Sequence, residues 1–375
     1  MNNSCFLSQL RRCRYLLLLL ASLLISLILL DSTKVLTEKD CYDQMLDAAQ
    51  RTEAAFSAVR EARLSSGEPI SPLEDPNSTG LIGLSYSDIT TTLGSLEAKR
   101  SSTNPNVAAM IVDMLVQCGV EPGDRVAVNF SGSFPGLNIA SICALEALGA
   151  EPVIISSVGA STYGANLPGL TYQDMEKLLF EQKLISHRST AFSLGGAGDL
   201  GKEMPPEVKA AIIARHRAGG LNYLEYADLD ENVAARRAIY EAEGAPVCLL
   251  NAGGNLLSFG GGTEMVHAKN GIINPSLKRD SGSGLIPLYH NQGVPVIHLL
   301  NMKALLKHYG LPFDPSPLPA AGEGGVYFRT QYSTPLMVVL AAVNLGLFVL
   351  AARHREKEGL PLHSAFTREK IEPRL

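Results

Sequence analysis

The sequence predicts an α/β fold in which a mostly parallel sheet carries helices on both faces, as in Rossmann-like proteins, flanked by two transmembrane helices. Two observations predict this arrangement. Short apolar stretches alternate with helical stretches through residues 81–310, which is typical of parallel strands covered on both sides. Uncharged apolar runs occupy residues 15–30 and 335–352, and each approaches the length that crosses a bilayer as a helix.

The first apolar run, YLLLLLASLLISLILL, follows Arg11, Arg12 and Arg14. As a helix it spans about 24 Å, so slight bilayer thinning or snorkelling must complete a core of about 30 Å. Basic residues beside a span favour the cytoplasm, which predicts that the tail 1–14 lies inside. A cleaved signal peptide is the alternative, although no small-x-small cleavage site follows the run. The absence of a Leu-x-x-Cys box before Cys41 argues against a lipoprotein.

The second run, PLMVVLAAVNLGLFVLAA, is followed by Arg353, Arg355 and Lys357, which predicts that the tail 353–375 is also cytoplasmic. A buried core helix is the alternative at this length. Asn344 is the strongly polar residue inside the run, and whether it contacts a partner helix is left open. The chain is therefore expected in the cell (inner or plasma) membrane, with its main domain extracytoplasmic.

Between the two runs, residues 31–80 are expected to form a membrane-proximal helix, 40–64, and a loop, 65–80. The stretch 120–158 predicts a βαβ unit with a strand at 125–130, a helix at 137–149 and a strand at 151–157. Further elements are expected in the order: helix 171–184, strand 189–194, helices 205–219 and 229–243, strand 246–250, helix or loop 284–293, strand 294–300 and helix 302–309. Residues 311–334 are expected to link the domain to the second run.

Composition excludes several classes of function. With 32 basic and 37 acidic residues the net charge is −5, which argues against nucleic acid as a partner. The four cysteines between the runs are widely spaced, so they predict neither a metal site nor a redox motif, although one disulfide is compatible with an oxidising compartment. No metal-binding motif is present, and we expect neither a metal nor a cofactor.

Four glycine- and serine-rich loops follow predicted strands, at 129–136, 156–162, 193–201 and 251–255. Ligands bind outside the carboxyl ends of strands in open α/β sheets, where such loops converge and helix N-termini attract anions. The alternative is that the glycines only turn the chain and Ser133 only caps a helix. The candidate ligand-binding residues are Ser131, Gly132, Ser133, Ser157, Gly159, Ser161, Gly196, Gly198, Asp199, Asn251, Gly253, Gly254 and Asn255.

Ser131 or Ser133 would be the nucleophile if the chain were a serine enzyme. The stretch S-G-S-F-P departs from the esterase elbow G-x-S-x-G, and no histidine stands in a recognisable triad context. The stretch G-G-A-G-D-L-G-K, 195–202, lacks the frame of a phosphate-binding P-loop. Its Asp199 and Lys202 either orient a charged ligand or form a solvated turn.

Several of these stretches resemble the poly-γ-glutamate system protein family. They are YSDITTTLGSLEAKRSSTNPN (86–106), GDRVAVNFSGSFPGLNIA (123–140), VIISSVGASTYGAN (153–166), SLGGAGDLG (193–201) and NAGGN with SFGGG (251–262). The resemblance implies a place beside the ligase, membrane and export components that make γ-linked glutamate polymers. It implies no catalytic residues.

The sequence therefore leads to a hypothesis of an accessory membrane protein of poly-γ-glutamate synthesis or export. Its expected partners are the lipid bilayer, other membrane components of that system and the anionic γ-glutamyl polymer. An extracytoplasmic amide hydrolase or transferase acting through Ser131 or Ser133 is the first alternative, and a small-anion receptor is the second.

Overall fold

The computed structural model describes residues 3–260, 269–275 and 282–357, and it divides into two compact units. The larger unit spans Lys39–Tyr327, and the smaller unit combines the terminal segments up to Glu38 and from Phe328. Most of the predicted tail 353–375 lies outside the described residues, as do the last two glycines of the predicted SFGGG motif.

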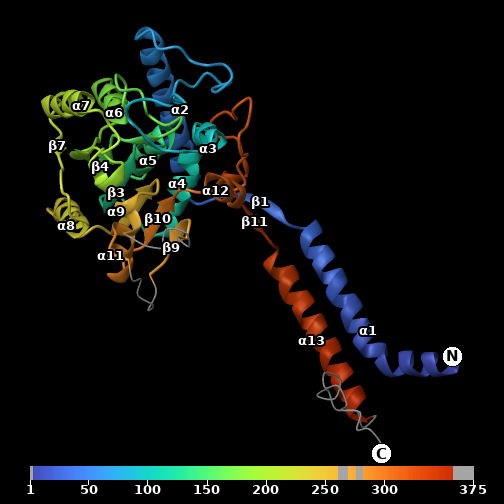
Figure 1. Ribbon diagram of the computed structural model, residues 1–375. Coiled ribbons are helices and arrows are strands. Elements are labelled where there is room, and N and C mark those ends of the chain that lie inside the picture. Colours follow the sequence, from blue (N-terminus) through green and yellow to red (C-terminus); the bar gives the residue numbers. More distant parts are fainter. Residues whose placement is uncertain (1–2, 261–268, 276–281, 358–375) are drawn as a thin grey trace, which may run out of the picture. The chain divides into compact units, whose positions relative to one another are not determined.

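The larger unit is built around a seven-stranded sheet (Figure 1), which confirms the predicted α/β class. The strands lie in the order β7-β6-β4-β3-β8-β10-β9, and all neighbours pair in parallel except β10 and β9. Their bounds are β3 Arg125–Ser131, β4 Glu151–Ser157, β6 Ala191–Ser193, β7 Asn222–Tyr223, β8 Cys248–Ala252, β9 Gly271–Ile273 and β10 Val296–Leu299. The antiparallel edge strand β9 was not predicted.

The chain begins the sheet at β3 and adds β4, β6 and β7 outward on one side. It then returns to place β8 against the other side of β3 and adds β10 beyond it. The strand order therefore reverses between β3 and β8. In open α/β sheets, ligands bind at the carboxyl ends of the strands beside such a reversal.

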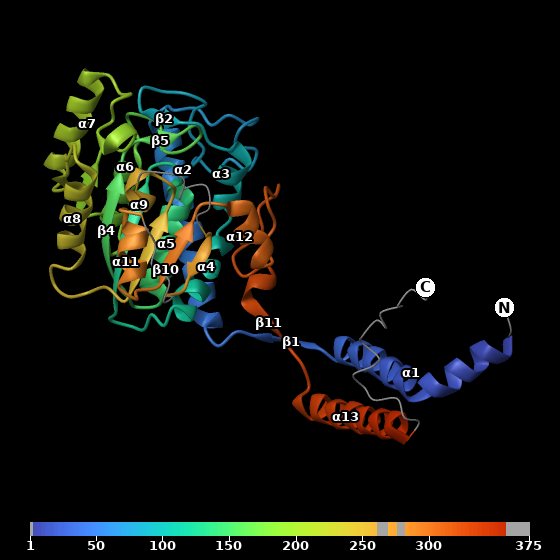
Figure 2. The ribbon, with the colours of Figure 1, turned by 60° about the horizontal axis from the view of Figure 1, so that its bottom comes forward.

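Helices cover both faces of the sheet (Figure 2), as the continuous apolar strands predict. On one face Phe130 of β3 contacts Tyr172 of α6, and Phe192 of β6 packs with Ile212 of α7. The helices on this face are α4 Asn106–Gln117, α5 Pro135–Ala147, α6 Tyr172–Glu181 and α7 Pro206–Ala218. We call it the α6 face.

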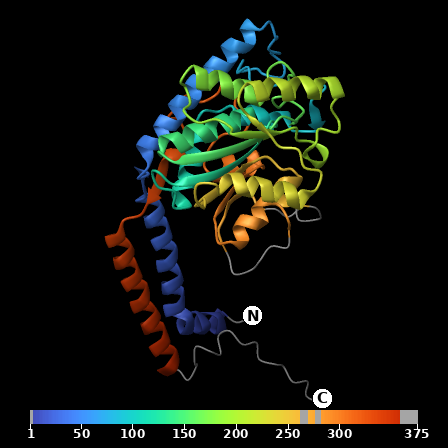
Figure 3. The same cartoon turned by 90° about the vertical axis from the view of Figure 1, so that its left-hand side faces the viewer.

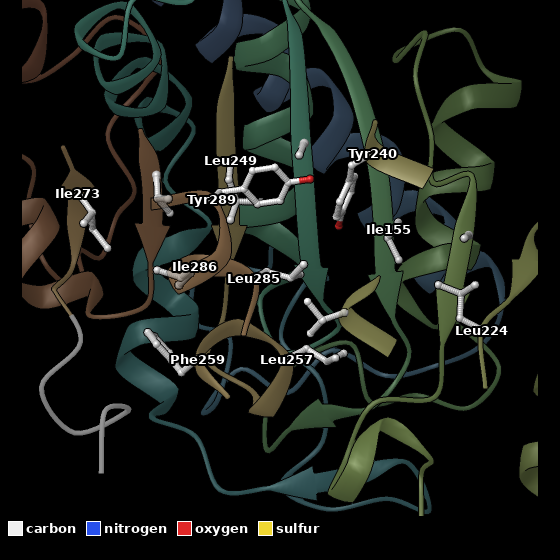
Figure 4. Close-up of a cluster of buried hydrophobic side chains, with 14 residues drawn as sticks. Ile155, Leu224, Tyr240, Leu249, Leu257, Phe259, Ile273, Leu285, Ile286 and Tyr289 are labelled. Atoms are coloured by element: carbon white, nitrogen blue, oxygen red, sulfur yellow. The ribbon is translucent and has the colours of Figure 1, made fainter. Parts of the chain in front are cut away.

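The opposite face carries α8 Leu229–Tyr240, α9 Leu256–Phe259 and α11 Leu285–Asn291. A buried apolar cluster joins the helices to the strands on this side and includes Tyr240, Tyr289, Leu249 and Ile155 (Figure 4). We call this the α8 face. Because side chains alternate along a strand, Ala127 and Asn129 of β3 share it, whereas Phe130 does not.

The larger unit begins and ends outside the predicted domain 81–310. Helix α2, Tyr42–Ser65, was expected as a membrane-proximal helix over 40–64. It buries Met45, Ala48 and Val59 and packs against α4 and α5. The expected linker also packs on the domain, where Arg100 Nε donates to Asp314 Oδ1 at 2.6 Å. Alanine-rich turns let helices approach closely, so the apparently polar α2 becomes part of the core.

Shorter elements complete the larger unit. The two-stranded parallel pair of β2 and β5 brings the segment near residue 90 against the loop after β4. The remaining elements are β2 Thr90–Thr92, α3 Leu96–Ser102, β5 Ala160–Ser161, η1 Ala197–Asp199, α12 Met302–His308 and η2 Gly325–Tyr327.

The smaller unit contains two helices long and apolar enough to cross a membrane, over Arg14–Ser32 of α1 (Asn3–Ser32) and over α13 (Thr334–Lys357). They lie side by side (Figures 1 and 3), and β1 (Val35–Glu38) pairs antiparallel with β11 (Phe328–Gln331) at one end. Asn344 Nδ2 of α13 donates to Ser26 Oγ of α1 at 2.9 Å. The polar residue whose role the sequence left open thus contacts the other apolar helix of the same chain.

Candidate functional site

The candidate site lies at the carboxyl edge of the sheet, beside the reversal between β3 and β8. Ser131 ends β3 and pairs in register with Ser157, which ends β4, and Ser157 pairs with Ser193, which ends β6. The sequence-predicted loops thus leave the sheet from neighbouring strands. Since paired residues in parallel strands share a face, the three serines form one row on the α8 face.

The loop between β3 and α5 holds two serines in direct contact. Ser131 Oγ donates to Ser133 Oγ at 3.1 Å and accepts from the Ser133 amide at 3.2 Å. Ser133 Oγ also accepts from the Ser161 amide at 3.0 Å. Ser133 therefore uses both oxygen lone pairs inside the protein, and its own proton is left to donate to a ligand.

The same loop is tightly enclosed on the side of the β4 loop. A Cβ at Gly132 would collide with the carbonyl oxygen of Val158, and one at Gly164 would lie 2.8 Å from the Ser133 carbonyl oxygen. The close approach requires glycine at both positions. Ser157, Gly159 and Ser161 are buried beneath it, while Ser133 is half-buried.

Lys99 of α3 lies against this loop, and sequence reasoning missed it. A Cβ at Gly136 would lie 2.7 Å from the Ser102 carbonyl oxygen, so the end of α3 packs directly on the first turn of α5. This packing buries Lys99 to 2% exposure. Its Nζ donates to the carbonyl oxygen of Ser133 and lies 3.4 Å from the centroid of the Phe134 ring.

Both contacts of the Lys99 ammonium are neutral groups. Burial therefore acts unopposed and lowers the pKa of Lys99 to about 7. A lysine in this state changes charge near neutral pH, so a nearby anion would favour its protonated form. Nothing in the stretch LEAKRSS distinguishes Lys99 from Arg100, whose guanidinium forms a half-buried pair with Asp314.

The loop after β6 turns its candidate carboxylate inward. Asp199 adopts a φ of 64° between glycines that also have positive φ, which directs its side chain under the loop. There Asp199 Oδ1 accepts from Ser193 Oγ at 2.7 Å and Oδ2 from Arg236 at 2.9 Å. Asp199 is thus neither exposed to a ligand nor part of a solvated turn, whereas Gly196 and Gly198 are half-buried.

The loop after β8 lies beside the loop after β3. Asn251 Oδ1 accepts from Asn129 at 2.7 Å, and Asn251 Nδ2 donates to Gly253 O at 2.7 Å and to His298 Nδ1 at 3.0 Å. Gly253 has a φ of 100°, and a Cβ there would lie 2.8 Å from Ser131 Cβ. The loops after β3 and β8 are therefore in contact.

The residues after Gly253 reach the surface. Gly254 is exposed, and half-buried Asn255 caps α9 through its Oδ1, which accepts from the Ser258 amide at 2.9 Å. The structure thus brings the loops of all four strands to one edge. Of the candidate residues, it leaves Ser133, Gly196, Gly198, Gly254 and Asn255 at least partly accessible.

Other reactive groups lie apart from this edge. Cys118 and Cys248 place their thiols in hydrogen-bond contact and both are free, as are Cys41 and Cys143. Within the described part of the chain, no group of three or more His, Cys, Asp or Glu side chains is arranged to hold a metal ion.

Comparisons with protein-family models, with curated proteins and with solved structures found no match to this chain.

Proposed function

We propose that this chain is a membrane-anchored accessory protein of poly-γ-glutamate synthesis or export, and that its strand-end loops bind carboxylates of the polymer or of a γ-glutamyl intermediate. The observation that carries the proposal is the placement of Lys99. Its buried ammonium group lies against the Ser131-Gly132-Ser133 loop, and its contacts there are neutral. A carboxylate would supply the counter-charge that this position lacks.

The neighbouring groups suit the same ligand. The Ser133 hydroxyl has its lone pairs occupied, so it meets a ligand as a donor, which matches a carboxylate oxygen. The first turn of α5 begins at Pro135, next to this hydroxyl, and helix N-termini favour negative charge. A γ-linked glutamate chain offers one α-carboxylate per residue, so successive carboxylates can pass such a site.

The proposal includes the membrane arrangement. Two helices are long and apolar enough to span a bilayer. In each, basic residues lie at the end nearer the chain terminus. By the bias of lysine and arginine toward the cytoplasm, both tails lie inside and the sheet domain lies outside, beside the other membrane components of the polymer system.

Binding of a γ-glutamyl oligomer to the full-length protein in lipid nanodiscs tests the proposal. The affinity should be about thirtyfold higher at pH 6 than at pH 8.5, because the carboxylate binds to protonated Lys99. Lys99→Met should remove both the affinity and its pH dependence. Lys202→Met is the matched control, since Lys202 is an exposed lysine beside the loop after β6. Equal loss in both variants, or no loss in Lys99→Met, would refute the proposal.

A serine-dependent amide hydrolase or transferase is the second candidate function. It is favoured by one observation. Ser133 Oγ accepts two hydrogen bonds, and the carbonyl oxygen of the same residue accepts from Lys99, whose pKa burial lowers to about 7. A neutral lysine can act as a general base, and donors to the serine oxygen would stabilise its anion.

Polymer measurements in a deletion strain separate the two functions. The strain is complemented with wild type or with a Ser131→Ala/Ser133→Ala double variant present at the same level. An accessory binding protein should restore polymer length and attachment in both cases, with less polymer in the variant. Altered length or attachment in the variant favours catalysis. Unchanged polymer on deletion leaves only the small-anion receptor.

A further inference from the structure

A cavity of about 300 Å³ lies between the first turns of α6 and the last turns of α7. It is distinct from the strand-end loops described above. Its polar lining comes from both helices and from the segment before β6: Gln173, Asp174, Glu176, Lys177, Arg188, Arg215 and His216. The cavity thus combines acidic, basic and neutral polar side chains in a space large enough for a small metabolite.

One buried acceptor in this lining has no partner. Gln173 is 2% exposed, and its Nε2 donates to Ser156 Oγ at 3.0 Å. Its Oε1 makes no hydrogen bond to any residue that the structure describes. Because an unpaired buried amide oxygen costs free energy, this atom calls for a donor from a ligand.

Two further acceptors, one from His216 and one from Asp174, lie near each other in the lining. Thr171 Oγ1 donates to Asp174 Oδ2 at 2.8 Å, so it accepts from His216 Nε2, at 3.0 Å. The other imidazole nitrogen, Nδ1, is then an acceptor, and it lies 4.0 Å from Asp174 Oδ1. Burial lowers the pKa of His216 to about 4, which keeps the ring neutral. Two acceptors at this distance can both receive protons from one donor group placed between them.

The fourth acceptor is Glu176, whose carboxyl is buried with neutral donors. Tyr172 Oη donates to Glu176 Oε1 at 3.1 Å, and Ser189 Oγ lies 3.0 Å from the same oxygen. Gln173, Asp174, His216 and Glu176 therefore contribute four acceptors to one part of the cavity lining. A primary ammonium group, which has three donors and no acceptor, is the chemical complement of such a set.

A cation at the same cavity is suited to a carboxylate. Arg188 lies with its guanidinium 5.3 Å from the Phe180 ring centroid, and no carboxylate of the described residues forms an ion pair with it. By contrast, Arg215 pairs with Asp174 and Lys177 with Glu181. When a guanidinium stacks on an aromatic ring, its N–H groups, which lie in the guanidinium plane, can still donate to a carboxylate.

We propose that the cavity between α6 and α7 binds a free α-amino acid, with its ammonium group among Gln173, Glu176, Asp174 and His216 and its carboxylate on Arg188. The site does not depend on the strand-end loops or on polymer binding, so either proposal can fail without the other.

The test uses the full-length protein in nanodiscs and isothermal titration with each of the twenty L-amino acids. At least one should bind with a Kd of about 1 mM or tighter. For the tightest ligand, the matched deamino acid and the matched decarboxylated amine should each bind at least tenfold more weakly. Failure of every amino acid to bind at 10 mM overturns the proposal, as does equal binding of either analogue.

Two variants locate the binding. Arg188→Met and Gln173→Met should each weaken it at least tenfold, with thermal unfolding recorded to show that each variant folds. Arg217→Met is the matched control for Arg188→Met. Arg217 is also stacked on an aromatic ring, Tyr223, but it does not line the cavity. Binding unchanged in Arg188→Met, or weakened equally in Arg217→Met, contradicts the proposed site.

Discussion

The two faces of the sheet bury polar groups in different ways. On the α8 face, fully buried Arg236 donates to Asp199, Ser193 and Asn129, so a cation and an anion share one hydrogen-bonded network. On the α6 face, Glu176 is equally buried, but its partners Tyr172 and Ser189 are neutral. Pairing leaves the first network satisfied and structural, whereas the second retains a titratable carboxyl beside a cavity and an unpaired amide oxygen.

This difference in pairing also distinguishes residues that serve the structure from residues that are candidates for binding. Asp199 serves the structure of the strand-end loops by fixing the loop after β6 to α8 through Arg236 and Asn232. Gln173 keeps an unpaired amide oxygen, and Glu176 is hydrogen-bonded to neutral groups without a cation. Since buried polar groups are normally satisfied, those that are not are the better candidates for binding.

The largest expected effect is loss of the charge pair on the α8 face. Arg236→Met leaves Asp199 buried without a cation and should lower the free energy of unfolding by about 3–5 kcal/mol. Urea unfolding of the full-length protein in detergent measures the loss. Arg237→Met is the matched control on the next residue of α8, where an exposed pair with Glu241 contributes about 0.5 kcal/mol or less. Similar losses in both variants would remove the contrast between the faces.

Removing the buried charge on the α6 face should raise the free energy of unfolding, whereas Arg236→Met lowers it. Burial raises the pKa of Glu176 to about 7 from 4.5. Between these values the folded state binds more protons than the unfolded state, so stability falls as pH rises, by about 3 kcal/mol in all at 1.36 kcal/mol per pKa unit. Glu176→Gln, which remains neutral, should therefore stabilise the protein at pH 8 and have little effect at pH 4.5.

Unfolding at several pH values checks this expectation. Glu181→Gln is the matched control, because Glu181 ends the same helix and forms an exposed pair with Lys177. It should change stability by about 0.5 kcal/mol or less at every pH. A destabilised Glu176→Gln variant at pH 8 would mean that the carboxylate is paired with a cation, and the two faces would then bury charge in the same way.

The elements of the sheet were predictable because buried parallel strands are continuous apolar runs with turns on both sides. The strands β3, β4, β6, β8 and β10 all fall within predicted segments or overlap them. The loops after β3, β4, β6 and β8 meet at one edge of the sheet. The two-residue β7 and the three-residue β9 are too short to produce an alternation or a run that differs from a loop.

The packing of α2 and of residues 311–327 was not predictable for a different reason. Their burial arises from side chains such as Asn106, whose Oδ1 accepts from Gly322 N at 2.9 Å and from Tyr327 Oη at 2.6 Å, more than 200 residues away in the chain. Lys99 was missed for the same reason. A lysine in a polar helix is expected to be exposed, and only the packing of α3 within the fold buries it.

The smallest expected change in stability concerns Lys99, the buried cation among neutral partners on the edge between the two faces. Burial lowers its pKa to about 7 from 10.5, so the unfolded state binds more protons above pH 7 and stability rises with pH. Between pH 7 and pH 9 the gain should be about 2 kcal/mol, because Lys99 is already half deprotonated in the folded state at pH 7. Lys99→Met should lose this dependence and be more stable than wild type at pH 7, while it binds γ-glutamyl oligomers more weakly. A residue that lowers stability but contributes to binding is expected in a binding site and not in a core.

Unfolding of both proteins at pH 7 and pH 9 checks this expectation. If the free energy of unfolding of the wild type did not change with pH, Lys99 would already have a counter-charge. The carboxylate of a γ-glutamyl ligand would then find no unpaired charge to bind.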